Sequence, residues 1–225
     1  MSPEKFSKEK QEHKIHETQD WIYAFQLALP IFIITLYYHY VRRGVFLPFF
    51  TEHDISFLYL VNKALALTAV VLVVISILIG PLAAFFPSFG KKIGCRKEIG
   101  LLGFFLAIGH IVITLFFIYW SFNWSFLTGL LAFLSFLAIV VFAGTRKSLI
   151  SLGYRKWKTI QRLVYPALFF ILLHILSLGK IAAWQEYLAH PSATSFLPPG
   201  TLVITVFILF GFFLRFVVFI KDRLK

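Results

Sequence analysis

Six long apolar stretches divide the chain, and polar segments separate them. They cover residues 21–41, 58–86, 99–120, 126–145, 163–178 and 201–220. Their lengths suit the roughly 20 residues that a helix needs to cross about 30 Å of hydrocarbon. Because hydrocarbon offers no partners for backbone N–H and C=O groups, stretches this apolar are expected to be helices rather than barrel strands. The pattern predicts an all-α, polytopic membrane protein with a six-transmembrane-helix bundle.

The composition agrees with this interpretation. Hydrophobic residues make up 59% of the 225 residues and include 28 Phe, which is more than a soluble core of this size needs. We expect an N-terminal segment at 1–20, the six-helix domain at 21–220 and a tail at 221–225. A short interfacial helix is expected at residues 180–190. One cysteine, Cys95, excludes an internal disulfide.

Basic residues are distributed unevenly between the two sets of connections. One side receives all but four of the 22 Lys and Arg residues, namely Lys5, Lys8, Lys10, Lys14, Lys91, Lys92, Arg96, Lys97, Arg146, Lys147, Arg155, Lys156, Lys158, Arg162, Arg215, Lys221, Arg223 and Lys225. The other side has Arg42, Arg43, Lys63 and Lys180. The positive-inside rule then predicts that both termini are cytoplasmic. Membrane orientation and the anionic lipid bilayer explain the net charge of +12, so no nucleic acid is expected as a partner.

Two of the seven histidines fall deep inside predicted spans. His110 and His174 each follow the cytoplasmic edge of their span by 11 residues, or about 16 Å, which is near mid-membrane. The two spans run in the same direction, so both side chains reach one level. A histidine in a span either bonds to a neighbouring helix or serves a functional site, and a pair at matched depth favours the functional interpretation.

The helical faces of both histidines also contain small residues: Gly103, Ala107 and Thr114 beside His110, and Ala167 and Ser177 beside His174. Small residues either make room for a bulky planar guest or only let helices pack closely. The chemical candidate is b-type haem, because its iron accepts an imidazole nitrogen on each axial side. Two histidines without a nearby Cys, Asp or Glu fall short of the usual zinc ligand number.

A resemblance supports this candidate. The stretch "LGYRKWKTIQRLVYPALFFILLH", together with "GCRKEIGLLGFFLAIGH" and "TGLLAFLSFLAIVVFAGTRKSL", resembles the haem-binding membrane subunit of the bacterial methionine-sulfoxide reductase system (the MsrQ or YedZ family), within the ferric reductase-like transmembrane domains. The similarity covers about residues 60 to 180. It implies that His110 and His174 are axial haem ligands, and that the protein is an electron-transfer subunit of the bacterial inner membrane.

One position departs from the family pattern. Family members usually have "LHRLVY" where this chain has "IQRLVY", so Gln161, next to Arg162, replaces a histidine proposed for a second haem. Because an amide does not ordinarily ligate haem iron, we predict one haem. FMN and quinone are further candidate cofactors, and the sequence leaves open whether a second haem or a flavin binds near Gln161.

Two other features have both a functional and a structural interpretation. His39, near Arg42 and Arg43, either anchors a haem propionate or the acceptor, or is an interfacial anchor. The basic residues of 146–162 surround Tyr154 and Trp157 and either dock an acidic flavoprotein or a flavin phosphate, or contact anionic lipid. His13 and His16 fall in the predicted tail, and His53 and His190 in predicted outer loops.

The resemblance implies a function in electron transfer rather than a self-contained enzyme, and no catalytic residue is predicted. Electrons would come from a cytoplasmic flavin reductase or from quinol, and would pass to an external acceptor such as the reductase catalytic subunit. A ferric or other metal reductase membrane component is an alternative within redox chemistry. A small transporter or a scaffold is an alternative from a different class, although the spans contain almost no acidic residue and show no repeat between halves.

Overall fold

The computed structural model describes residues 3–42, 57–117, 122–190 and 197–224. The helices are α1 (Pro3–Tyr40), α2 (Phe57–Phe85), α3 (Arg96–Phe117), α4 (Trp124–Ala143), α5 (Arg146–Gln161), α6 (Val164–Ser177), α7 (Ile181–Ala189) and α9 (Gly200–Arg223), with a 3-10 helix, η3 (Pro87–Lys92). The described residues contain no strand. Among them, six helical segments are long and apolar enough to cross a membrane, which confirms the predicted all-α, multi-pass fold.

Two segments outside the predicted spans are helical. The N-terminal segment at 1–20 is helical from Pro3, so α1 continues without a break into the first candidate span, Thr18–Tyr40. The predicted connection at 146–162 is mostly helix α5, which is interrupted at Gly153 by a positive φ of 73°. Helix α6 has 14 residues, or about 21 Å, which is short of the hydrocarbon thickness. The candidate span Lys147–Ser177 therefore includes α5 as well as α6.

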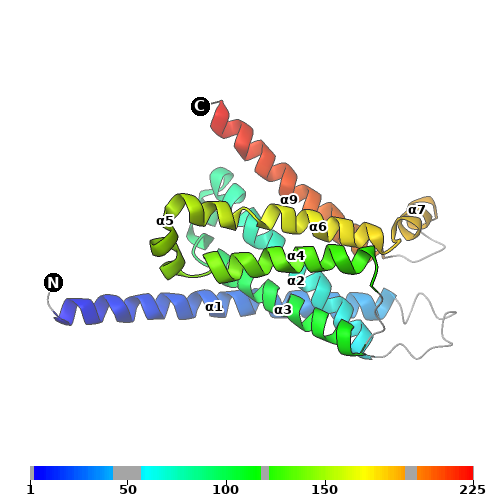
Figure 1. Cartoon of the computed structure of the whole chain (residues 1–225), viewed down its shortest axis with the longest axis horizontal. Helices are drawn as coiled ribbons and strands as arrows, with labels where there is room; N and C mark the ends of the chain where they lie inside the picture. Colours follow the sequence, from blue (N-terminus) through cyan, green and yellow to red (C-terminus); the bar gives the residue numbers. More distant parts are fainter. Residues whose placement is uncertain (1–2, 43–56, 118–121, 191–196, 225) are drawn as a thin grey trace.

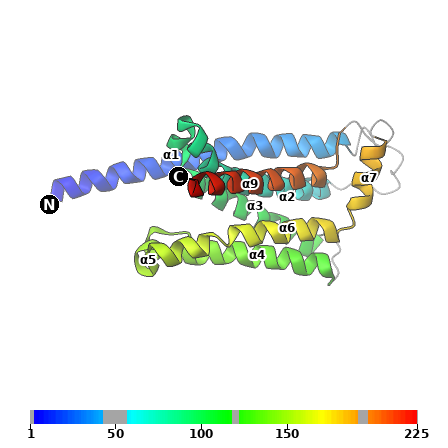
Figure 2. The ribbon, with the colours of Figure 1, turned by 90° about the horizontal axis from the view of Figure 1, so that it is seen from above.

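The helices form two groups (Figures 1 and 2). Helices α1, α2, α3 and α9 pack around α2, whereas α4 packs against α6 and α5. Helix α1 begins and α9 ends at one end of the bundle, and α7 lies at the other (Figure 1). We call the end where α3 begins and α2 finishes the Arg96 end, and the end where α2 and α4 begin the Phe57 end. Which end faces the cytoplasm stays a prediction from the charges.

Close packing holds the first group together. Leu72 and Ile99 are fully buried between α2 and α3, with Ala24 of α1 beside them. Gly103 of α3 lies so near α2 that a Cβ atom there would come within 2.9 Å of the Ala69 carbonyl oxygen. Real Cβ atoms do not approach backbone this closely, so α2 and α3 need a glycine at this contact.

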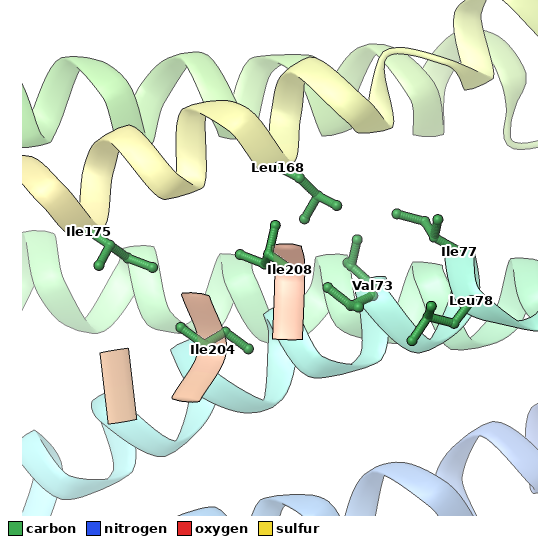
Figure 3. Packing of buried hydrophobic residues seen from close by; sticks show 8 residues of the cluster. Val73, Ile77, Leu78, Leu168, Ile175, Ile204 and Ile208 are labelled. Atoms are coloured by element: carbon green, nitrogen blue, oxygen red, sulfur yellow. The ribbon is translucent and has the colours of Figure 1, made fainter. Parts of the chain in front are cut away.

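The two groups meet through fewer contacts. Leu168 and Ile175 lie on the side of α6 that faces α2 and α9, where they join a cluster with Val73, Ile204 and Ile208 (Figure 3). Between α3 and α4, the rings of Phe104 and Phe133 stack with centroids 5.6 Å apart and an interplanar angle of 9°. We call this boundary between the groups the seam.

The glycine contact generates a stability prediction. Gly103→Ala is expected to lower the free energy of unfolding by about 1–3 kcal/mol, because the added methyl overpacks the interface with Ala69. The matched control is Gly109→Ala in the same helix, where the new Cβ would lie an ordinary 3.5 Å from Leu65 Cδ1. That variant is expected to be neutral or to gain up to about 1 kcal/mol of helix propensity. Thermal unfolding in detergent compares them, and equal melting temperatures would contradict the close α2–α3 approach.

Candidate functional site

A group of hydrogen-bonded polar residues surrounds the two histidines that lie in the spans. His110 of α3 is half-buried, and its Nδ1 lies 2.8 Å from Asn62 Oδ1 of α2. Asn62 is 4% exposed, and its Nδ2 donates to Thr114 Oγ1 at 3.1 Å. The Thr114 hydroxyl in turn donates to the His110 carbonyl oxygen at 2.8 Å. These bonds form a closed chain that joins the imidazole, the amide and the hydroxyl.

This series of hydrogen bonds fixes the tautomer of His110. Because the Thr114 hydroxyl hydrogen is used on the His110 carbonyl, its oxygen accepts from the NH₂ of Asn62. The carbonyl side of the Asn62 amide therefore faces Nδ1, and an oxygen of this kind only accepts hydrogen bonds. Nδ1 carries the proton, and Nε2 keeps its free lone pair.

His174 of α6 is held in a similar way by a different helix. Its Nδ1 lies 2.7 Å from the backbone carbonyl oxygen of Ser125, in the first turn of α4. The ring packs on Gly129, where a Cβ atom would lie 3.1 Å from Nδ1. Since a carbonyl oxygen can only accept, Nδ1 of His174 also carries the proton. Neither Nε2 has a hydrogen-bond partner among the described residues.

The two imidazoles belong to opposite groups of helices. Each ring is bonded at Nδ1 to a helix of its own group, His110 to α2 and His174 to α4. Nε2 lies across the ring from Nδ1, so each Nε2 is directed away from the helix that holds the ring. The His174 side chain and the Lys63 ammonium of α2 both lie close enough to His110 to influence its charged form, and Lys63 also lies close enough to influence His174. The described residues thus bring two imidazoles and one cation together at one level.

This level is not the middle of the bundle. His174 lies three residues before the end of α6, which is about 4.5 Å of helix, and its partner Ser125 is in the first turn of α4. Asn62 is five residues into α2, or about 7.5 Å from its start. These partners agree with the predicted matched level, and relative to the helix ends the pair lies nearer the Phe57 end than the Arg96 end. The mid-membrane depth stays a prediction.

Of the two interpretations of the small residues, close helix packing describes Gly103, which faces Ala69 of α2, while Thr114 is used in hydrogen bonds. On the other helix, Ala167 is fully buried. The small residue that makes room at a histidine is instead Gly129, on the neighbouring helix α4.

The secondary site residues lie elsewhere. His39 is near the end of α1, with its Cε1 against Gly200 at the start of α9 and its ring edge-on to Tyr38. Gln161 ends α5, and its position is 13 residues before His174, on the order of 20 Å along the helices. Arg162 is exposed beside it. Arg43 and His53 lie outside the described residues.

Sequence reasoning missed the residues that hold the imidazoles. Asn62 has a visible signal, because it is a carboxamide inside an otherwise apolar span. Ser125 has none, because it contributes a backbone carbonyl that every residue possesses. Gly129 has only a weak one, since glycine is common in spans.

No larger metal cluster accompanies the pair. Within the described parts of the chain, no group of three or more His, Cys, Asp or Glu side chains is placed to hold a metal ion. Cys95 is 3% exposed between η3 and α3, and its Sγ donates to the Lys92 carbonyl oxygen. Burial, helped by the nearby Asp20 carboxylate, raises the pKa of the Cys95 thiol. This thiol therefore stays protonated and unreactive at neutral pH.

The hydrogen-bond chain predicts the outcome of two isosteric changes. Thr114→Val is expected to lower the free energy of unfolding by about 1–2 kcal/mol, because it leaves the Asn62 amide without its acceptor. Thr205→Val in α9 is the control, since Thr205 Oγ1 is buried without a hydrogen-bond partner among the described residues. The control should be neutral or more stable. Thermal unfolding of both variants in detergent tests this, and equal losses would argue against the Asn62–Thr114 bond.

No model of a known protein family matches the chain, and no curated protein matches it. The functional assignment therefore depends on the chemistry of the site and on the resemblance of its motifs.

Proposed function

We propose that the protein is a haem-b membrane subunit that transfers electrons across the bilayer, with His110 and His174 as the axial ligands. The observation that carries the proposal is the common hydrogen-bond pattern of the two rings. Each Nδ1 donates to a carbonyl-type oxygen, which leaves both Nε2 lone pairs available. Metal-binding histidines usually have this arrangement, because the bond at the far nitrogen fixes the tautomer and raises the basicity of the ligand.

The donor set suits this group better than a bare metal ion. Two imidazoles alone fall short of a zinc site, whereas haem iron needs only two protein ligands beyond the porphyrin. The ligands come from α3 and α6, on opposite sides of the seam, where the helix groups make few contacts. When bound, haem b supplies reversible one-electron transfer. The chain's own residues orient the two nitrogens and place a positive charge, Lys63, near both.

The direction of transfer follows from the charges and the resemblance. Basic residues gather at the Arg96 end, which we take as cytoplasmic, so the histidine pair lies nearer the external side. A cytoplasmic flavin reductase or quinol is the proposed donor, and an external methionine-sulfoxide reductase catalytic subunit the proposed acceptor. A position near the external side suits delivery to such an acceptor. The bacterial inner membrane is the corresponding location.

The first test is haem content. Wild-type protein purified from iron-replete cells is expected to contain one haem per chain, with a Soret band that shifts on reduction with dithionite. His110→Ala and His174→Ala should each lose most of this absorption, because one imidazole holds haem far more weakly than two.

His190→Ala is the matched control, since this exposed histidine follows α7 and lies outside the proposed site. It should retain normal haem. Unchanged haem content in both ligand variants, with folding verified by gel filtration and circular dichroism, would reject the proposal.

The second test uses the nearby charge. Lys63→Gln is expected to lower the midpoint potential, because a positive charge stabilises the reduced form. A unit charge at about 10 Å and an effective dielectric constant near 20 contributes about 1–2 kcal/mol, or on the order of 50 mV. Lys63→Arg keeps the charge and should leave the potential almost unchanged. A spectroelectrochemical titration measures this, and equal potentials in both variants would remove Lys63 from the site.

A further inference from the structure

The second half of α5 presents a row of cations on one face. Gly153 divides α5, and the part that follows it continues towards α6 alongside α4 (Figures 1 and 2). Arg155, Lys158 and Arg162 follow one another at intervals of three and four residues, which places them on the same side of the helix. All three side chains are exposed. We call these three residues the basic stripe.

The opposite face of this half-helix holds it in place. Trp157 is half-buried, and its Nε1 donates to the carbonyl oxygen of Ala143, the last residue of α4, at 3.1 Å. Ile160, three residues further on, is half-buried on the same side. The basic stripe is therefore turned away from α4, while α4 fixes its height along the bundle.

The bond at Trp157 also indicates the depth of the stripe in the membrane. Helix α4 has 20 residues, or about 30 Å, so it is just long enough to cross the hydrocarbon. Its last residue, Ala143, then lies at the hydrocarbon edge with Trp157 beside it, at the level that tryptophan prefers. At a rise of about 1.5 Å per residue, Arg155 lies about 3 Å outside Trp157 and Arg162 about 7.5 Å inside it. The stripe thus extends from the headgroups to just below them.

The stripe has no acidic counterpart within the protein. Residues 146–162 contain no Asp or Glu, and none of the three cations forms an ion pair within the described parts of the chain. Lys158 Nζ donates to the Tyr154 hydroxyl oxygen at 3.0 Å, one turn nearer the start of α5, so the ammonium is turned outward. Long basic side chains near the end of a span turn in this way to reach the headgroups. Cations exposed at this depth need anions from their surroundings.

The depth decides between two kinds of anionic partner. An acidic protein approaches from water and cannot contact Arg162 below the hydrocarbon edge. Lipid phosphates lie at the membrane surface, within reach of side chains that turn outward, and they accept hydrogen bonds from both arms of a guanidinium group. Ile150 in the first half of α5 is 77% exposed and Tyr154 is 61% exposed, and such side chains suit the boundary between headgroups and acyl chains. A lipid therefore fits this surface better than a protein.

We propose that the basic stripe binds the phosphates of anionic phospholipids in the leaflet at the Arg96 end. These lipids stabilise the second half of α5 in its position against the end of α4. The proposal goes beyond electron transfer, because the stripe is separate from the histidine pair and does not depend on haem.

The test measures lipid-dependent stability of the full-length protein in detergent. Phosphatidylglycerol is expected to raise the melting temperature of the wild type, whereas phosphatidylcholine should do so much less. Arg162→Gln is expected to weaken the apparent affinity for phosphatidylglycerol about fivefold, and replacement of all three stripe residues by Gln more than tenfold. Because the three side chains are exposed, both variants should fold, which gel filtration and an unchanged haem content verify.

The matched control removes three exposed cations from the same end of the bundle but outside the stripe. It combines Lys147→Gln, Lys156→Gln and Arg223→Gln, so its net charge equals that of the triple stripe variant. Its response to phosphatidylglycerol should stay within about twofold of wild type, because the lipid phosphates bind the stripe and not the general charge.

Four outcomes would overturn the proposal. The triple stripe variant could respond to phosphatidylglycerol like wild type, or the control could lose as much affinity, which would indicate general charge attraction. Inorganic phosphate at millimolar concentration could stabilise the wild type as much as phosphatidylglycerol, which would assign the stripe to a soluble phosphate compound. A polyglutamate peptide could stabilise the wild type equally and lose its effect in the triple stripe variant, which would assign the stripe to an acidic protein.

Discussion

Two hydrogen bonds at Nδ1, one for each ring, determine what the histidine pair of this bundle can do. A buried polar group surrounded by lipid must find its partner inside the protein. Asn62 Oδ1 meets this requirement for His110, and the Ser125 carbonyl oxygen meets it for His174. The same bonds that make the imidazoles tolerable in the membrane also select their tautomer. The same two hydrogen bonds therefore satisfy the buried Nδ1 atoms and determine which ring nitrogen keeps its lone pair. Removal of either oxygen would affect both properties of the ring that it holds.

The two imidazoles lie on different helix groups, one on each. Helix α2 organises the first group through tight contacts such as Gly103 on Ala69, whereas α4 and α6 form the second. Each imidazole is fixed from within its own group, so its free nitrogen is directed away from that group. The seam is joined by apolar contacts, including the Phe104–Phe133 stack and the cluster at Leu168.

The two ends of the bundle have different chemistry. At the Phe57 end, two imidazoles that lie near Lys63 leave their Nε2 atoms without a hydrogen-bond partner among the described residues. At the Arg96 end, the Arg96 guanidinium donates to the Ser76 carbonyl oxygen of α2, and the Ser76 hydroxyl donates back to the Arg96 carbonyl oxygen, so the polar groups there bind α3 to α2 within the first helix group.

The sequence by itself determined the six apolar spans, the absence of strands from the described residues, and the choice of His110 and His174 as the unusual side chains. The length of an apolar run and the presence of a rare polar residue can be read from the local sequence. In lipid, the first decides whether a segment can span the membrane, and the second marks a candidate functional residue. Only the tertiary structure decided which groups meet the imidazoles. A carboxamide 48 positions away and a backbone carbonyl 49 positions away leave little or no trace in a sequence pattern. It also showed that α5, interrupted at Gly153, precedes α6 within one candidate span, which run length alone does not show.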